Sequence, residues 1–513
     1  MIAPLENDMT GLDAAWTELD AWQPQQIAAL VTAGDATRLE RLVHHVADIR
    51  FDFAKTHLDD PALAALANIA AAGDYVSRRR VLFAGEIANP TEGRAAEHTA
   101  ERSEGAPDSV HRAQMLHHRM RLLVDAIEAG AFGEIRHLLH IGIGGSALGP
   151  DLLIDALGRR ADRYEVAVVS NVDGAALQAA FDRFDPATTM VAIASKTFST
   201  FETMLNAASA LEWLEEGGVA DPFGRVIALT ADPEKAVAWG VDETRVLPFN
   251  ENVGGRYSLW SSIGFPAALA LGWDAFEELL EGAAEMDRHV RLTDGPANVA
   301  LLAAFVDQLY AGRLGCQTRA VFAYDERLRL LPSYLQQLEM ESNGKSVDLA
   351  GQPVGRPTSP VTWGGVGTDA QHAVFQLLHQ GTHLIPVEFV VAREPDHHLD
   401  PAHHEALVQN CIAQGAALMA GRGHDDGARA YPGDRPSTTI LLDQVSPHSL
   451  GALLAFYEHR TFANAVMLGI NPFDQFGVEL GKEMAKAVSD GGGDFDPATR
   501  ALMAAALGDG TNR

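Results

Sequence analysis

The stretch HIGIGGSALGP, residues 140–150, joins a short apolar run to a cluster of glycines. This pattern predicts a buried strand, a glycine-rich turn and then a helix with Pro150 in its first turn. The backbone N–H groups of such a turn converge on one point, and the N-terminus of the helix adds positive potential there. The stretch therefore predicts an anion-binding turn, to which Ser146 would add a hydroxyl donor.

The same turn has two other interpretations. Gly142, Gly144 and Ala147 match the G-x-G-x-x-G/A pattern of dinucleotide-binding folds, and Asp173 follows the next predicted strand, where a ribose-binding acid would stand. Alternatively, the glycines allow a tight turn that binds nothing. The stretch alone leaves phosphate binding, dinucleotide binding and a tight turn open.

Apolar segments outside this stretch predict the fold class. They stand between helix-like segments, at residues 164–170, 188–195 and 224–230, and again at 318–324, 361–365, 384–391 and 438–443. Continuous apolar runs between helices are typical of parallel strands covered on both faces. We expect an α/β fold with two tandem, mostly parallel sheets covered by helices, and helical extensions at both ends. The expected boundaries are 1–114 for an N-terminal helical layer, 115–275 and 276–465 for the two sheet domains, and 466–513 for a C-terminal helical segment.

Composition and charge narrow the possible partners. The hydrophobic fraction of 47% and the charged fraction of 21% exclude a largely disordered or fibrous protein. Lys and Arg number 39 and Asp and Glu number 69, so the formal net charge is −30. Such a surface repels nucleic acid and anionic membranes, and we expect neither as a partner. An anionic substrate would need a local basic pocket.

The cysteine content and the first residues favour a cytoplasmic protein. Cys316 and Cys411 are the two cysteines, which excludes a disulfide framework and a cysteine-based zinc motif. The opening MIAPLENDMTGLDAAW has neither the basic nor the apolar region of a signal peptide. No apolar run reaches the roughly 18–20 residues of a membrane span.

A second stretch with anion-binding character is ASKTFSTFET, residues 194–203, at the end of another predicted strand. It carries a lysine and four hydroxyl side chains within six positions: Ser195, Lys196, Thr197, Ser199 and Thr200. This density favours binding of a phosphate dianion at the carboxyl edge of a sheet. The alternative is a helix N-cap, which needs only one of these hydroxyls.

Two later stretches carry charged side chains. In VGGRYSLWSSIG, residues 253–264, Arg256 follows two glycines, which allow the backbone to approach a ligand closely. Arg256 would then bind an oxyanion with its guanidinium; alternatively, it is a cation on the surface. In QQLEMESNGKS, residues 336–346, Glu341 is a candidate general base. Glu339 is predicted to lie at an exposed helix end, with Gly344 as its C-cap.

Histidines and a C-terminal helix complete the candidates. His372, His379 and His383 fall in one helical stretch, where one of them would be catalytic or all would be structural. The stretch DHHLDPAHHE, residues 396–405, is the richest group of possible metal ligands. Alternatively, Asp400 is the N-cap of a helix with Pro401 in its first turn, and the histidines lie in a loop and on the surface. Helical spacing places Gln475, Glu479 and Lys482 on one helix face, either as a site or as a solvated face.

Taken together, these stretches resemble the glucose-6-phosphate isomerase (phosphoglucose isomerase) family. The resemblance covers most of the chain in the family's order, including FDFAKTHL, NPTEGRAAEHTA, GIGGSALGP, ASKTFSTFET, GGRYSLW, QQLEMESNGK, GTDAQHAVFQLLHQGT and NPFDQFGVELGK. It implies two sugar-isomerase (SIS) domains and the reversible conversion of D-glucose 6-phosphate to D-fructose 6-phosphate in glycolysis and gluconeogenesis. It implies no metal and no organic cofactor.

The resemblance also implies roles for individual residues. The phosphate would be held by Ser195, Thr197 and Thr200, with Lys196 and the turn at Gly145 and Ser146 closing the site. His372 and Lys482 would open the sugar ring, and Glu341 would carry a proton between C2 and C1 through a cis-enediol. Arg256 would stabilise the negative charge, and Gln337 and Gln475 would orient hydroxyls. The site would lie in a homodimer, with the histidine supplied by the neighbouring subunit.

Two other functions compete with this interpretation. A nicotinamide-dependent enzyme would use the turn at Gly142, Gly144 and Ala147 for its dinucleotide. A sugar-phosphate sensor without catalytic activity would need the hydroxyl cluster but would have no use for Glu341, His372 and Lys482 together. The joint presence of these three residues favours an enzyme.

Overall fold

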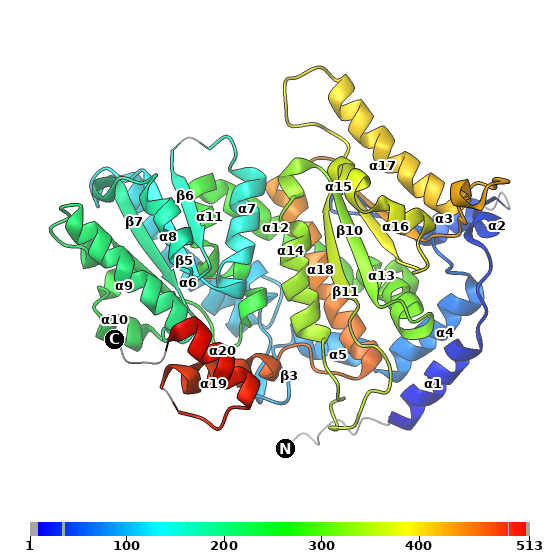
Figure 1. Ribbon diagram of the computed structural model, residues 1–513, viewed down its shortest axis with the longest axis horizontal. Helices are drawn as coiled ribbons and strands as arrows, with labels where there is room; N and C mark the ends of the chain where they lie inside the picture. Colours follow the sequence, from blue (N-terminus) through cyan, green and yellow to red (C-terminus); the bar gives the residue numbers. More distant parts are fainter. Residues whose placement is uncertain (1–8, 33–35, 162, 491, 509–513) are drawn as a thin grey trace. The chain divides into compact units, whose positions relative to one another are not determined.

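Parallel strands with covered faces form two separate sheets in the computed structural model, which describes residues 9–32, 36–161, 163–490 and 492–508 (Figure 1). The chain divides into two units, Met1–Pro472 and Phe473–Arg513. Both sheets belong to the first unit. The predicted α/β fold class is confirmed.

The first sheet has five parallel strands in the order β6-β5-β7-β8-β9. Its strands are β5 (His137–Gly142), β6 (Glu165–Val169), β7 (Thr189–Ala194), β8 (Val226–Thr230) and β9 (Val246–Pro248). Every residue of the central strand β7 is buried, which is why its sequence is apolar without alternation. The three-residue strand β9 was not predicted, since a run this short carries no periodic signal.

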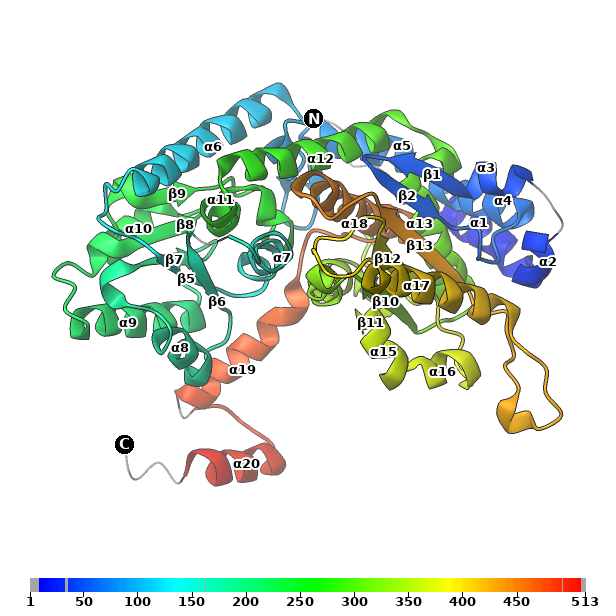
Figure 2. The same cartoon turned by 90° about the horizontal axis from the view of Figure 1, so that it is seen from above.

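Helices cover this sheet on both faces (Figure 2). One face packs against residues of α8 (Gly174–Phe181), α9 (Phe201–Glu216) and α10 (Pro233–Trp239). The helices that contact the other side are α6 (Pro107–Glu128), α7 (Leu148–Leu157) and α11 (Phe265–Leu271). The apolar faces of six helices therefore bury the sheet, leaving its carboxyl edge for polar loops.

The second sheet has the strand order β1-β2-β13-β12-β10-β11. Four strands are parallel: β10 (Thr318–Tyr324), β11 (Val361–Val366), β12 (Val387–Ala392) and β13 (Ser437–Leu442). An antiparallel hairpin of β1 (Val43–Val46) and β2 (Ile49–Asp52) pairs with β13. The N-terminal region was predicted to be helical throughout, so this hairpin corrects that prediction. The sequence VHHV of β1 is only partly buried and lacks a clear apolar pattern.

The rest of the N-terminal region is mainly helical. Its elements are α1 (Met9–Ala21), α2 (Ile27–Thr32), α3 (Ala36–Leu42), α4 (Asp60–Ala72), α5 (Tyr75–Phe83) and the small hairpin of β3 (Ile87–Asn89) and β4 (Arg94–Ala95). Asp59 caps α4 by accepting a hydrogen bond from the backbone of Ala62. Trp16 and Leu19 of α1 are buried.

Two long helices pack closely at the centre of the first unit. They are α12 (Trp273–Leu292) and α18 (Pro447–Leu468), and a glycine on each permits the close approach. A Cβ at Gly282 would lie 1.9 Å from the carbonyl oxygen of His448, and a Cβ at Gly451 would lie 2.0 Å from that of Leu279. Further helices of this half are α13 (Val299–Asp307), α14 (Leu331–Leu335), α15 (Gly367–Ala373), α16 (Phe375–Gln380) and α17 (Ala402–Ala420).

The second unit consists of α19 (Glu479–Ser489) and α20 (Pro497–Leu507), with the short turn η13 (Phe476–Val478) before them. Gln475 precedes η13 with an extended φ of −153°, so it lies outside α19. The predicted helix face shared by Gln475, Glu479 and Lys482 is therefore wrong for Gln475. Over the described ranges, none of the helices has both the length and the apolar character needed to cross a membrane.

Candidate active site

The two stretches predicted to bind an anion meet at one edge of the first sheet. Strands β5 and β7 are neighbours, and Gly142 at the end of β5 pairs with Ala194 at the end of β7. A Cβ on Gly142 would lie 2.9 Å from the carbonyl oxygen of Ser146 and 3.1 Å from the Cβ of Ala194. A side chain at this position would collide with both neighbours, so the position requires a glycine. The glycine turn therefore packs against the loop that begins at Ser195.

The glycine turn itself is packed backbone against backbone. Gly144 has a φ of +60°, which favours glycine, and it begins the short helical turn η2 (Gly144–Ser146). A Cβ on Gly145 would lie only 2.1 Å from the carbonyl oxygen of Gly255 and 2.5 Å from the backbone nitrogen of Arg256. The turn therefore holds the loop that carries Arg256.

Asp173 has a structural role. It is the N-cap of α8, and its carboxylate accepts a hydrogen bond from the backbone of Ala175 at 3.0 Å. Aspartate is a preferred N-cap residue, so capping of the helix alone accounts for an aspartate at this position. The dinucleotide interpretation thus loses the acidic residue that supported it.

The hydroxyl loop places its polar side chains at the start of a sixteen-residue helix. The Ser195 side chain is buried, and its Oγ lies 3.1 Å from Oγ1 of Thr200. Thr200 occupies the N-cap position of α9 but makes no side-chain capping hydrogen bond. The Ser199 hydroxyl donates to Oγ1 of Thr197 at 2.9 Å. The N-terminus of α9 and these hydroxyls together offer donors to an anion.

Lys196 links this loop to the one that precedes Arg256. Its ammonium group donates to the carbonyl oxygens of Glu251 at 2.6 Å and Val253 at 3.1 Å. Burial, and next the charge of Arg94, lower the pKa of Lys196 below its usual value. The lysine therefore adds positive charge near the hydroxyl loop, while its Nζ atom lies against backbone carbonyls.

Arg256 is buried, which excludes the interpretation as a surface cation. It lies in the helical turn η6 (Gly255–Trp260), and only 4% of its surface is exposed. Its Nε donates to the Ser342 hydroxyl at 2.6 Å, and Nη2 donates to the carbonyl oxygen of Pro472. Its Nη1 lies 3.7 Å from a carboxylate oxygen of Glu341. A fixed guanidinium thus faces the candidate base.

Glu341 and Gln337 belong to one unusual turn. Both lie in the π-helical segment η11 (Gln336–Glu341), a geometry that is rare and concentrates at functional sites. The Glu341 side chain is 21% exposed. The Gln337 amide nitrogen lies 2.7 Å from where a Cβ on Gly144 would be. The π-helical segment therefore contacts the glycine turn at one residue and Arg256 at another.

The prediction for Glu339 is wrong. It was expected at an exposed helix end, but it is buried, and both its carboxylate oxygens accept hydrogen bonds from Arg319. Helical spacing alone gave no sign of this ion pair, because Arg319 lies on the strand β10 and not on the same helical segment. The hydrogen bond of the Gly344 backbone to the carbonyl of Met340 agrees with its predicted capping role.

His372 is not joined to this site within one chain. His372 lies exposed on α15, and no hydrogen bond or ion pair connects it with Glu341 in the described part of the chain. Gln475 and Lys482 belong to the second unit, where Lys482 is exposed on α19. His379 donates from Nε2 to the amide oxygen of Gln414 at 2.9 Å, which gives it a structural partner.

The histidine-rich stretch 396–405 begins a helix. The Asp400 carboxylate accepts a hydrogen bond from the backbone of Ala402 at 2.9 Å, at the start of α17. The ring of His404 bonds the carbonyl oxygen of Arg393 at 2.8 Å. In the described ranges, no group of three or more His, Cys, Asp or Glu side chains is arranged to hold a metal ion.

His140 is a residue at the site to which the sequence analysis gave no role. It is fully buried in β5, and its Nε2 donates to the carbonyl oxygen of Ser146 at 2.6 Å. Burial lowers its pKa to about 4, so the ring is neutral at pH 7. The signal was present in the sequence as a polar residue between the apolar Leu139 and Ile141, just before the glycine turn.

The two covered parallel sheets, with polar loops gathered at a carboxyl edge around a buried arginine and a carboxylate, define an α/β protein of the sugar-phosphate isomerase class. The sequence matches the phosphoglucose isomerase family over residues 52–503, and the chain belongs to this family.

Relatives from several bacteria match over almost the whole chain. A glucose-6-phosphate isomerase of Sphingopyxis alaskensis is 76% identical over 98% of this chain and 100% of its own length. One from Zymomonas mobilis is 62% identical over 97% and 98% of the two chains. The crystal structure of a glucose-6-phosphate isomerase from Chlamydia trachomatis is 30% identical and superposes with a TM-score of 0.86, covering 98% of this chain and 99% of the other.

Proposed function

We propose that this chain catalyses the reversible isomerisation of D-glucose 6-phosphate to D-fructose 6-phosphate. The observation that carries the proposal is the pair of Arg256 and Glu341 at 3.7 Å, beside a glycine turn and a loop of hydroxyls suited to a phosphate. Proton transfer next to a carbonyl requires a base and a positive group for the enediolate oxygen, and these two side chains are such a pair.

The phosphate is bound at the start of α9. Ser195, Thr197 and Thr200 donate hydroxyl hydrogen bonds, and the turn at Gly145 and Ser146 closes the site. Lys196 adds positive charge at this site, which attracts an anionic substrate locally although the protein carries a net charge of −30. Binding energy from the phosphate holds the reacting carbons in place.

The chemistry takes place at the other end of the sugar. Glu341 removes the proton from C2 of the open-chain aldose and delivers it to C1 through a cis-enediol. Arg256 stabilises the negative charge that develops on the oxygen, and Gln337 orients a hydroxyl. His372 and Lys482 move the protons that open the ring, and Gln475 orients a further hydroxyl. Positioned acid–base catalysis of this kind contributes about 10²–10⁴-fold in rate.

The working form that we propose is a cytoplasmic homodimer. His372 is exposed on its own chain and is not joined to Glu341, which supports a site completed by the histidine of a second copy. We further propose that residues 115–275 and 276–465 form the two SIS domains. The 1–114 layer then contributes to the second domain, since its β1–β2 hairpin extends the second sheet.

An assay on Glu341→Gln tests the proposal. Formation of glucose 6-phosphate from fructose 6-phosphate is followed in the presence of EDTA for the unaltered protein and for this variant. We expect turnover to fall by at least about 10³-fold in the variant, because the amide cannot take a proton, while binding of the sugar phosphate is retained. Turnover that survives the change would refute the assignment of the base.

A further inference from the structure

The π-helical segment that carries Glu341 is held from two sides. On one side, Ser342 accepts a hydrogen bond from Arg256, and the Asn343 amide donates to the carbonyl oxygen of Thr461 at 3.0 Å. Both contacts are made by the two residues that directly follow Glu341. The π-helical segment is short, so contacts to its other residues also affect the position of the Glu341 carboxylate.

The opposite side is held through Glu339, two residues before Glu341. Arg319 on β10 donates to both oxygens of the Glu339 carboxylate, and the Thr362 hydroxyl on β11 donates to Oε2 at 2.7 Å. Arg319 and Thr362 are direct partners in the register of these two strands. Two neighbouring side chains of the second sheet, Arg319 and Thr362, therefore bind the Glu339 carboxylate of the π-helical segment.

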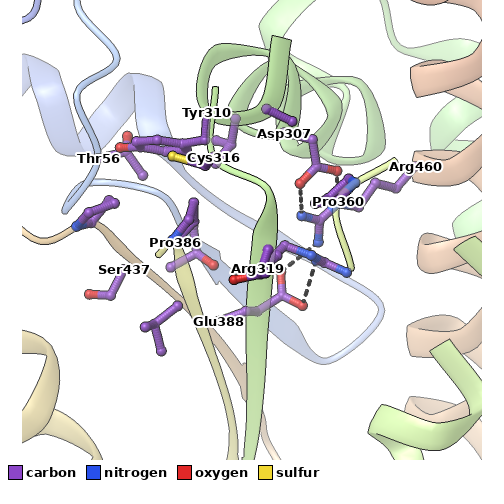
Figure 3. Close-up of a pocket in the computed structure, with 16 residues that line it drawn as sticks. Thr56, Asp307, Tyr310, Cys316, Arg319, Pro360, Pro386, Glu388, Ser437 and Arg460 are labelled. Atoms are coloured by element: carbon purple, nitrogen blue, oxygen red, sulfur yellow. Dashed lines mark hydrogen bonds and ion pairs between the residues drawn. The ribbon is translucent and has the colours of Figure 1, made fainter. Parts of the chain in front are cut away.

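Arg319 is itself fixed by a larger buried network (Figure 3). Its Nη1 donates to Glu388 at 3.3 Å, and Glu388 also accepts from Arg460 at 2.6 Å and from the Tyr457 hydroxyl at 2.7 Å. Arg460 in turn donates to Asp307 at 2.6 Å. Each charged side chain in this network has an opposite charge beside it, which burial demands.

The network is a rigid anchor rather than a hydrated pocket. The cavity that these side chains line has a volume of about 20 Å³, room for about one water molecule. The neighbouring arginines hold the pKa values of Asp307 and Glu388 below their usual range, against the effect of burial. The carboxylates therefore stay ionised, and the hydrogen bonds that fix Arg319 are retained.

We propose that Glu339 is a positioning residue, which locks the π-helical segment onto Arg319 and Thr362 and thereby sets the place of the Glu341 carboxylate. This inference rests on the proposed function, in which Glu341 is the base. It adds that the second sheet, through its buried ion network, acts on the reaction without touching the substrate.

Two matched variants test the proposal. Thr362→Val removes the 2.7 Å hydrogen bond to Glu339, and Thr189→Val, at the start of β7 in the first sheet, removes a 2.7 Å hydrogen bond to the carbonyl oxygen of Asp185 outside this network. Both hydroxyls are buried, and both substitutions leave the carbon framework nearly unchanged. We expect Thr362→Val to lower kcat about tenfold, because a misplaced reacting group costs up to about 10²-fold, with KM within about twofold. We expect Thr189→Val to keep kcat within about twofold, because no reacting group depends on its hydrogen bond.

Two further measurements make the outcome decisive. Urea midpoints of both variants show whether they lose the same stability, and Glu339→Gln, which removes the charge at similar volume, should lower kcat at least as much as Thr362→Val. Equal kcat values for Thr362→Val and Thr189→Val would overturn the positioning role. If Glu341→Gln retains turnover, the proposed function fails instead, so the two failures are distinguishable.

Discussion

The guanidinium of Arg256 lies 3.7 Å from the carboxylate of Glu341, and its Nε binds the hydroxyl of the next residue, Ser342. The arginine thus contacts both the candidate base and the backbone segment that carries it. At this distance the positive charge is placed to stabilise an enediolate that forms beside the carboxylate.

Replacing this arginine should reduce the rate of the chemical step. For Arg256→Ala we expect kcat to fall about 10²–10³-fold, the cost of losing one preorganised group that stabilises a developing charge. Arg256→Lys should recover only part of this loss, because an ammonium cannot reproduce the fork that binds Ser342 and Pro472. Steady-state kinetics with circular dichroism as the folding control measures both effects. An unchanged kcat in Arg256→Ala would contradict the assigned role.

The hydroxyl loop should control substrate binding. Ser195→Ala removes a buried hydroxyl that pairs with Thr200, and we expect KM for fructose 6-phosphate to rise about 10–100-fold, since a hydrogen bond to a charged group contributes about 1.5–3 kcal/mol. Inhibition by inorganic phosphate should weaken by a similar factor. Ser199→Ala is the matched control, because Ser199 bonds only to Thr197 among the described contacts and should leave KM within about threefold. Equal effects of the two changes would exclude the proposed phosphate position.

Local sequence patterns predicted the strands and the stretches of the site, because both depend on neighbouring residues. The apolar runs that became β5, β7 and β8 could be identified, since burial on both faces makes most of their positions apolar. The ion pair of Arg319 with Glu339 could not be predicted, because it joins a strand to a π-helical segment through tertiary packing. His140 was missed for a similar reason: its partner, the Ser146 carbonyl, depends on how the turn folds back.

A methyl group at the glycine turn should disrupt the site. In Gly145→Ala the added Cβ would lie 2.1 Å from the carbonyl oxygen of Gly255, so the Arg256 loop must move. We expect kcat/KM to fall at least about 10²-fold, as displaced reacting groups cost that much. Gly174→Ala is the control, because nothing lies within 4 Å of its added Cβ and the same substitution is harmless there. Kinetics of the two variants, with thermal unfolding midpoints, would show whether the effect is specific to the turn.

The neutral His140 should make the folded state less stable in acid. The unfolded chain protonates this ring below about pH 6.5, whereas the folded chain does so only at about pH 4. The unfolded state therefore binds more protons between these values, and the free energy of unfolding falls as the pH drops through this window. From pH 7 to pH 5 the loss assigned to His140 is about 2 kcal/mol.

His140→Gln removes this titration. Urea unfolding at pH 7 and pH 5 should show a smaller loss of stability in the variant than in the unaltered protein, by about 2 kcal/mol. His289, whose pKa is also lowered to about 4, is present in both proteins, so its contribution cancels in the difference. An identical pH dependence for the two proteins would mean that His140 is not held neutral by burial.

The proposed shared site predicts complementation between two inactive proteins. His372 lies exposed on α15 of its own chain, and Glu341 lies beside Arg256. If each site takes Glu341 from one copy and His372 from the other, a heterodimer of Glu341→Gln with His372→Ala has one intact site and one doubly altered site. After the two variants are unfolded together and refolded as an equal mixture, random pairing should restore about a quarter of the full activity. Each variant refolded alone is the control and should stay inactive. A mixture that regains no activity although a heterodimer forms would place His372 and Glu341 of a site on the same chain, or remove His372 from the site.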